Sequence, residues 1–298
     1  MGWDIIGAGA IGSLWAKRLQ QSGNHVNLIL RTEKQVDQFY QQGAHLGVFH
    51  SEGHTSIPCT ASTPSTINHN ITQLLVPTKA FDAFDALESV RSKLAANATI
   101  VVMINGYGAQ QQIQKAYSDY NLFFASTTDG AFNKAPFHTV HAATGSTLIG
   151  KLDNPEKRSD TPLISTDWSR NIDSVLWRKV TINSCINPVT ALYSCRNGEI
   201  FLTPERTDLI TALVHEIEQL EKAIAFIRDV PLLDEVKRIA HLTADNRSSM
   251  LQDVLNSRRT EIEHINGAIV KRASLHKIET PRHQEMINSI RALTESHQ

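Results

Sequence analysis

The sequence predicts two domains, an α/β domain in residues 1–168 and an all-α domain in residues 169–298, and its 298 residues are enough to bury two cores. Up to about residue 150, short apolar runs alternate with longer amphipathic stretches, which is the pattern of a βαβ series. A polar, turn-rich stretch from Lys151 to Thr166 then interrupts this pattern. From about Asn171 onward, apolar residues recur at three- and four-residue steps, the period of a helix.

The first domain contains five expected strands. Several are apolar throughout, which is typical of parallel strands covered on both faces. The expected strands are Trp3–Ile6, His25–Leu30, Gln73–Pro77, Thr99–Ile104 and Leu122–Thr127.

The clearest helix of the second domain carries an apolar seam that is expected to run until Pro231 stops it. A seam of about three heptads favours packing within its own domain over a free coiled coil. Its residues are Leu209, Leu213, Ile217, Leu220, Ile224 and Ile227.

Charge and composition exclude several classes of protein. A formal net charge of -1 without a long basic run argues against nucleic-acid binding. No apolar stretch approaches the roughly 20 residues of a membrane helix, and the first residues lack the pattern of a secretory signal. We therefore expect a cytoplasmic protein with neither nucleic acid nor membrane as a partner.

Cysteines and histidines give no pattern of a metal site or a disulfide framework. The three cysteines (Cys59, Cys185 and Cys195) are few and irregularly spaced. The closest notable histidine pair, His138 and His141, would point to opposite faces of a strand. No metal is expected.

A glycine-rich turn follows the first strand and opens a helix, which is where a dinucleotide-binding motif must lie. In such a turn, Gly7 permits the tight bend, Gly9 lets the backbone approach a pyrophosphate and Gly12 lets helix and strand pack closely. A turn without a ligand is the alternative. The motif favours a Rossmann-like domain whose cofactor-binding residues include Gly7, Ala8, Gly9, Ala10, Ile11 and Gly12.

Residues after the later strands favour NADP as the cofactor. Arg31 stands where an NAD enzyme usually has a carboxylate, and a guanidinium can pair with the 2′-phosphate. Glu33 lies two residues further on. If the strand ended later than expected, its carboxylate would take the position of Arg31 and favour NAD instead. Lys79 is either a phosphate or ribose contact or a solvated loop lysine, and Asn105 is placed to face the nicotinamide.

Lys179, Asn183 and Asn187 follow one another at four-residue steps, so on a helix they form one polar stripe. Asn is a poor interior helix former and usually needs a reason to be there, so the stripe favours a binding site over a solvated helix face. On the stripe alone, satisfied core amides and a lysine paired with a surface acid remain alternatives.

Over nearly its whole length, the chain resembles the ketopantoate reductase family. The matching segments are Gly7 to Gly12 with Arg31, Thr78-Lys79-Ala80, Asn105-Gly106-Tyr107-Gly108, Leu176-Trp177-Arg178-Lys179 with Asn183, Ile186-Asn187-Pro188, Asn197-Gly198-Glu199, Asn246 to Asp253 and Thr260 to Gly267. Two departures are a shorter segment from Lys151 to Ser174 and the pair Asp129-Gly130.

The resemblance implies NADPH-dependent reduction of 2-dehydropantoate to (R)-pantoate, a step toward pantothenate and coenzyme A, in an interdomain cleft. It implies that Lys179 is the general acid and that Glu261 is an acidic residue near the cofactor and the substrate hydroxyl. The remaining implied contacts are Asn183, Asn187 and Asn197 as substrate amides, Asn246 and Ser249 as carboxylate ligands, Asn105 as a contact shared by cofactor and substrate, and Ala131 as a backbone cofactor contact.

Two alternatives stay open beside this assignment. Pocket shape chooses among substrates, so a paralogous reductase of another 2-oxo acid would carry the same stripe. The second alternative is a sensor protein that binds NADPH without catalysing a reaction. The expected partner is a small 2-oxo acid, and the expected assembly is a monomer or a homodimer.

Overall fold

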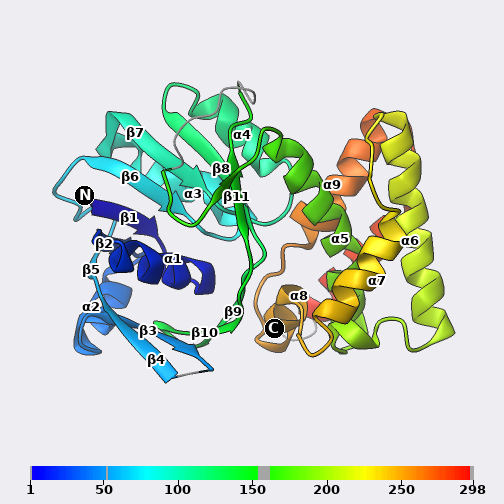
Figure 1. Cartoon of the computed structure of the whole chain (residues 1–298), viewed down its shortest axis with the longest axis horizontal. Helices are drawn as coiled ribbons and strands as arrows, with labels where there is room; N and C mark the ends of the chain where they lie inside the picture. Colours follow the sequence, from blue (N-terminus) through cyan, green and yellow to red (C-terminus); the bar gives the residue numbers. More distant parts are fainter. Residues whose placement is uncertain (1, 52, 154–161, 296–298) are drawn as a thin grey trace. The chain divides into compact units, whose positions relative to one another are not determined.

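The computed structural model describes residues 2–51, 53–153 and 162–295. The chain divides into two compact units (Figure 1). Unit 1 comprises Met1–Ile104 and Ala109–Val175, and unit 2 comprises Asn105–Gly108 and Leu176–Gln298. The short segment Asn105–Gly108 therefore lies within the first half of the sequence but belongs to the helical unit. No helix in the described ranges is long and apolar enough to cross a membrane.

Unit 1 is built on an eight-stranded sheet with the strand order β12-β11-β8-β7-β6-β1-β2-β5. The five strands predicted from apolar runs are all present in it and run parallel. They are β1 (Gly2–Ile6), β2 (His25–Ile29), β6 (Ile71–Val76), β7 (Leu94–Val102) and β8 (Asn121–Thr127). The other three are β5 (Thr60–Ser62), β11 (Thr147–Gly150), which is antiparallel to β8, and β12 (Asp167–Trp168).

The order of the strands creates a switch point between β1 and β6. The chain moves from β1 to β2 in one direction and from β6 through β7 to β8 in the other. Right-handed crossovers then put α1 (Ala10–Gln21) on one face and α3 (Ala80–Val90) with α4 (Ala109–Ala116) on the other. In such sheets, ligands bind beyond the carboxyl ends of the strands at this point.

A second sheet of four strands was not predicted. Its order is β4-β3-β10-β9, and α1 contacts all four of its strands as well as β1 and β2 (Figure 1). Its strands are short and carry polar or histidine side chains, so they lack the apolar runs that identified the main sheet. They are β3 (His45–His50), β4 (Gly53–Pro58), β9 (Gly130–Ala135) and β10 (His138–Ala143).

The second sheet is tied to α1 by an ion pair. Both Nη atoms of Arg18 on α1 donate to Asp129, at 2.7 and 2.9 Å, and Asp129 directly precedes β9. The Asp129 side chain is 1% exposed and also accepts from the Gly145 amide. His141 on β10 lies 3.3 Å from the same carboxylate, whereas His138 contacts the carbonyl of Pro136. Among the described residues, no group of three or more acidic, histidine or cysteine side chains could hold a metal ion.

The described part of unit 2 is helical, as predicted. Its core is formed by apolar residues of the six α-helices, among them Trp177, Leu213, Val236 and Ile269. The helices are α5 (Ile172–Leu192), α6 (Pro204–Ala223), α7 (Leu232–Leu242), α8 (Ser249–Leu255), α9 (Ile262–Leu275) and α10 (Pro281–Glu295), with a 3₁₀ turn at Asn197–Glu199.

The expected extent of the seam helix was wrong. Helix α6 ends at Ala223, and Ile227, expected in the seam, is 82% exposed. Ala225 adopts a left-handed conformation with φ of 53°, and the Phe226 amide bonds back to the carbonyl of Glu221 at 2.9 Å. This turn closes the helix well before Pro231, and apolar spacing alone cannot reveal it.

Candidate active site

The glycine turn of unit 1 lies at the switch point of the main sheet. Gly7 has a φ of +85°, and its amide donates to the carbonyl of Ile29 at 2.8 Å. A Cβ at Gly12 would lie 3.1 Å from Pro77 Cγ and 3.3 Å from the carbonyl oxygen of Gly7. The left-handed conformation of the turn thus favours glycine at position 7, and close packing against Pro77, the residue after β6, favours glycine at position 12.

The middle glycine is different because the protein itself does not require it. A Cβ at Gly9 would meet nothing closer than the carbonyl oxygen of Pro77, at 3.9 Å. Gly9 is the N-cap of α1, and neither a side-chain cap nor a first-turn acid occupies this helix start. Space beside Gly9 and the uncapped amides suit the pyrophosphate of a dinucleotide. These residues therefore fit the cofactor that the sequence predicts.

Strand β9 borders the glycine turn. Asn133 Nδ2 donates to the carbonyl of Ala8 at 3.4 Å. Ala131, two residues earlier on β9, packs against the same apolar core as Ala8 and Ile11. Ala131, the expected backbone cofactor contact, therefore lies on a strand of the second sheet and packs against the core that supports the glycine turn.

Arg31 and Lys79 occupy the carboxyl ends of β2 and β6. Strand β2 ends at Ile29, so Arg31 lies in the loop before α2 (Glu33–Gln41), and Glu33 is a helical residue. Arg31 Nη2 lies 3.0 Å from Asp82 Oδ2, in the first turn of α3. Lys79 is the N-cap residue of that same helix. Arg31 is thus closer to the end of β2 than Glu33 is, and it stays the residue that we expect to meet a 2′-phosphate.

In unit 2, the segment Asn105–Gly108 is fixed to the start of α9. The amide of Tyr107 donates to the carbonyl of His264 at 2.9 Å. Gly106 has a φ of +78°, and a Cβ there would lie 2.5 Å from the same carbonyl oxygen, so only glycine fits. Asn105 Nδ2 then lies 3.4 Å from Glu261 Oε2, and Glu261 is only 2% exposed. Two predicted site residues, 156 positions apart, are in contact.

The polar stripe lies on α5, as predicted. Lys179 and Asn183 are half-buried and Asn187 is 7% exposed. Pro188 lies within the helix and cannot donate to the carbonyl of Ser184. Asn266 of α9 donates to that carbonyl at 3.0 Å instead. The proline thus creates an acceptor that ties the helix of the stripe to the helix that follows Glu261.

Asn197 and Asn246 also come together in unit 2. The Asn197 amide donates to the carbonyl of Asn246 at 3.0 Å, and Asn197 Nδ2 donates to Thr243 at 2.9 Å. Asn197 Oδ1 is buried and has no hydrogen-bond partner among the described residues. Ser249 is exposed as the first residue of α8, and the preceding Ser248 bonds to Thr190 of α5 at 2.6 Å.

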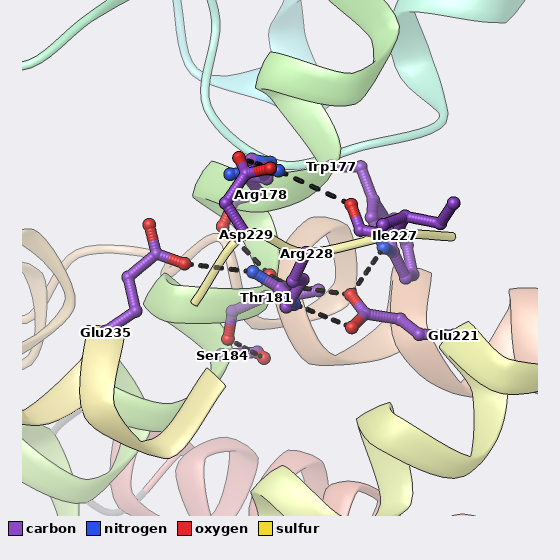
Figure 2. Close-up of polar contacts among 9 residues, drawn as sticks. All are labelled: Trp177, Arg178, Thr181, Ser184, Glu221, Ile227, Arg228, Asp229 and Glu235. Atoms are coloured by element: carbon purple, nitrogen blue, oxygen red, sulfur yellow. Dashed lines mark hydrogen bonds and ion pairs between the residues drawn. The ribbon is translucent and has the colours of Figure 1, made fainter. Parts of the chain in front are cut away.

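Arg228 is buried and contacts the face of α5 that lies opposite the polar stripe (Figure 2). Both oxygens of Glu221 accept from Arg228 at 2.6 Å, and Glu235 accepts at 3.0 Å. Arg228 also donates to the Thr181 hydroxyl at 2.6 Å, and Trp177 Nε1 donates to Glu221 at 2.9 Å. We call Arg228, Glu221, Glu235, Trp177 and Thr181 the Arg228 network.

The Arg228 network faces away from the stripe. Trp177 and Thr181 are four residues apart and share one face of α5, while Lys179 lies about 200° around the helix from Trp177. The Trp177 ring also packs edge-on against Tyr107, with centroids 5.3 Å apart, and under Arg272 at 4.2 Å. Trp177 therefore connects the Asn105–Gly108 segment, α5 and α9.

Sequence reasoning missed the Arg228 network, Asn266 and His283. The Nδ1 atom of the fully buried His283 accepts from Asn266, and its Nε2 donates to the carbonyl of Leu213. Burial lowers the pKa of His283 to about 4. One signal was available for Asn266, because a proline within a helix predicts a free carbonyl four residues earlier.

The chain matches two family models that together cover most of its length. The model described as "Ketopantoate reductase PanE/ApbA" matches residues 3–154, and "Ketopantoate reductase PanE/ApbA C terminal" matches residues 171–294. A 2-dehydropantoate 2-reductase of Vibrio cholerae serotype O1 is 31% identical over an alignment 300 residues long, which covers 98% of this chain and 97% of that protein.

Solved structures show the same fold. A D-mandelate dehydrogenase with NADH and anilino(oxo)acetate has a TM-score of 0.88 at 22% identity, over 99% of both chains. A PanE/ApbA family ketopantoate reductase from Ralstonia eutropha JMP134 has a TM-score of 0.87 at 21% identity, also over 99% of both chains.

A phosphate-binding turn at the switch point of a parallel sheet is typical of dinucleotide-dependent oxidoreductases, and unit 1 defines the protein as one of this class. The matches narrow the class further. The chain belongs to the ketopantoate reductase family, whose members are oxidoreductases that use NADPH.

Proposed function

We propose that this protein reduces 2-dehydropantoate to (R)-pantoate with NADPH. The observation that carries the proposal is the contact of Asn105 with Glu261 in the unit that also presents Lys179 and Asn183 on one helix face. Such a set can hold the oxygens of a small 2-oxo acid with a hydroxyl group. The name of the relative from Vibrio cholerae supports the choice of substrate.

Most of the residues that we assign to the cofactor belong to unit 1. The residues Gly7 to Gly12 would hold its pyrophosphate, and Arg31 and Lys79 would lie toward its 2′-phosphate. When bound, NADPH supplies the hydride that reduces the keto carbon. Asn105 and Ala131 are the further cofactor contacts that we assign.

The substrate side of the reaction belongs to unit 2. The Lys179 ammonium donates a hydrogen bond to the keto oxygen, stabilises the negative charge that develops there and transfers a proton to it. Asn183, Asn187 and Asn197 bind the polar groups of the substrate. Asn246 and Ser249 donate to its carboxylate, whose negative charge requires that Glu261 face the hydroxyl end instead.

The Lys179→Ala variant tests the mechanism. Turnover should fall by about a hundredfold to ten-thousandfold, the range for loss of a general acid, while NADPH binding stays nearly intact. Arg178→Ala is the matched control, because Arg178 is the adjacent cation on α5 and pairs with the exposed Asp229. Its turnover should stay within about twofold. Normal turnover of Lys179→Ala would contradict the assigned role.

A panel of 2-oxo acids tests the substrate. With NADPH in excess, kcat/KM should be highest for 2-dehydropantoate. A higher value for another branched or aromatic 2-oxo acid would identify the protein as a paralogous reductase, because pocket shape and not the stripe sets this choice. NADPH binding without turnover of any acid in the panel would instead support the sensor.

A further inference from the structure

The arginine expected to meet a 2′-phosphate already has an anionic partner in the protein. Arg31 Nη2 lies 3.0 Å from Asp82 Oδ2, and these side chains are 74% and 36% exposed. Arg31 lies in the loop after β2, and Asp82 lies in the first turn of α3, which follows β6. Both strands flank β1, so the pair lies at the carboxyl edge of the sheet where the cofactor is proposed to bind.

The position of Asp82 is well defined within its helix. Its amide donates to the carbonyl of Lys79 at 3.0 Å, and a carboxylate in the first turn is stabilised by the helix dipole. A carboxylate and a phosphate present similar oxygens to a guanidinium. An anion held at Arg31 therefore competes with the 2′-phosphate and also repels it.

We propose that Asp82 is a specificity-determining residue that limits the preference of this protein for NADPH over NADH. This inference rests on the proposed function, which places the 2′-phosphate at Arg31. NADH has a hydroxyl in place of that phosphate, so it binds with the Arg31–Asp82 pair intact. The 2′-phosphate of NADPH must either displace Asp82 from Arg31 or bind beside its negative charge, and both reduce the affinity for NADPH.

The competing explanation is that Asp82 only stabilises the start of α3. Removal of the charge would then lower the melting temperature slightly and leave the ratio of the two cofactor affinities unchanged. Asp85 offers a matched control, because it is an exposed carboxylate one turn further along the same helix. Asp85→Asn removes the same charge from α3 without removing the partner of Arg31.

The experiment compares the Kd values of NADPH and NADH for the wild type, Asp82→Asn and Asp85→Asn by nucleotide fluorescence titration. In Asp82→Asn, NADPH should bind about threefold to tenfold more tightly, while the Kd of NADH changes by less than about twofold. The Asp85→Asn variant should shift the ratio by less than about twofold. Equal ratios in the two variants would overturn the proposal.

Arg31→Ala separates this inference from the proposed function. It should weaken NADPH much more than NADH. Asp82→Asn added to it should favour NADPH less than it does alone, because the competition needs the guanidinium and only the repulsion between Asp82 and the phosphate is left to remove. If Arg31→Ala weakens both cofactors equally, the assigned phosphate site is wrong and the inference fails with it. If it weakens NADPH selectively but Asp82→Asn has no selective effect, only the role of Asp82 is refuted.

Discussion

Arg228 of unit 2 and Arg31 of unit 1 both bind carboxylates, but their surroundings differ. The Arg228 side chain is 8% exposed and donates to Glu221, Glu235 and Thr181, whereas Arg31 is 74% exposed and pairs with Asp82. Isolated exposed ion pairs contribute little to stability and can exchange partners. A buried charge that loses its partner strongly destabilises the fold, because it is then neither paired nor hydrated. The comparison assigns a structural role to the buried arginine and leaves the exposed one available for ligand binding.

The first prediction is the largest, and it concerns Arg228→Ala. This variant leaves Glu221 buried without its bidentate partner, so the free energy of unfolding should fall by about 3–5 kcal/mol. Urea denaturation measures it, followed by tryptophan fluorescence in a background in which Trp3, Trp15 and Trp168 are replaced by phenylalanine, because Trp177 is then the one remaining tryptophan and donates to Glu221.

A double variant serves as the control for Arg228. Replacing Arg228 and Glu221 together by methionine removes both charges and keeps much of the volume, so stability should recover partly toward the wild type. If Arg228→Ala lowered the free energy of unfolding by less than about 1 kcal/mol, the Arg228 network would contribute no more than an exposed ion pair does. The contrast between Arg228 and Arg31 would then be wrong.

The second prediction uses acid to distinguish the units. Burial lowers the pKa of His283 to about 4 from an ordinary value of 6.5, so the unfolded chain binds this proton more readily than the folded one. Stability from this group is complete above pH 6.5 and is lost as the pH falls toward 4, by about 3 kcal/mol in total. Urea denaturation at pH 7 and at pH 4, followed by Trp177 fluorescence in the same tryptophan-reduced background, should report this loss, and His283→Gln should flatten the pH dependence. A wild type equally stable at both pH values would contradict the prediction.

The third prediction is that the stability of unit 1 falls at a lower pH than that of unit 2. Burial alone would raise the pKa of Asp129, but hydrogen bonds from Arg18, Gly145 and Thr127 outweigh it and lower the pKa to about 2. Stability from this carboxylate is present above its ordinary pKa of 3.8 and is lost as the pH falls to 2, by about 2 kcal/mol. Asp129→Asn should remove this part of the pH dependence, with Asp119→Asn as an exposed control. If the wild-type slope persisted in Asp129→Asn, another group would cause it.

Sequence patterns revealed the features whose cause is local. The strands of the main sheet, the glycine turn and the stripe on α5 each depend on residues close together in the chain. The Arg228 network could not be predicted, because its arginine lies in a segment that apolar spacing assigned to a helix and its partners come from three helices. The second sheet could not be predicted for a similar reason. Its strands have no apolar pattern in the sequence, and they are stabilised by contacts with α1 and by the ion pair between Arg18 and Asp129.

The last prediction is the smallest effect on stability and the sharpest test of the comparison. Asp82→Asn should change the free energy of unfolding by less than about 1 kcal/mol, because the lost pair is exposed and only a helix-dipole contribution remains. Urea denaturation followed by circular dichroism measures the change, with Asp85→Asn as the reference. A loss as large as that of Arg228→Ala would mean that Asp82 is a structural residue. A small loss in the free energy of unfolding, together with a changed ratio of the Kd values of NADPH and NADH, is the result expected if Asp82 affects cofactor binding and not stability.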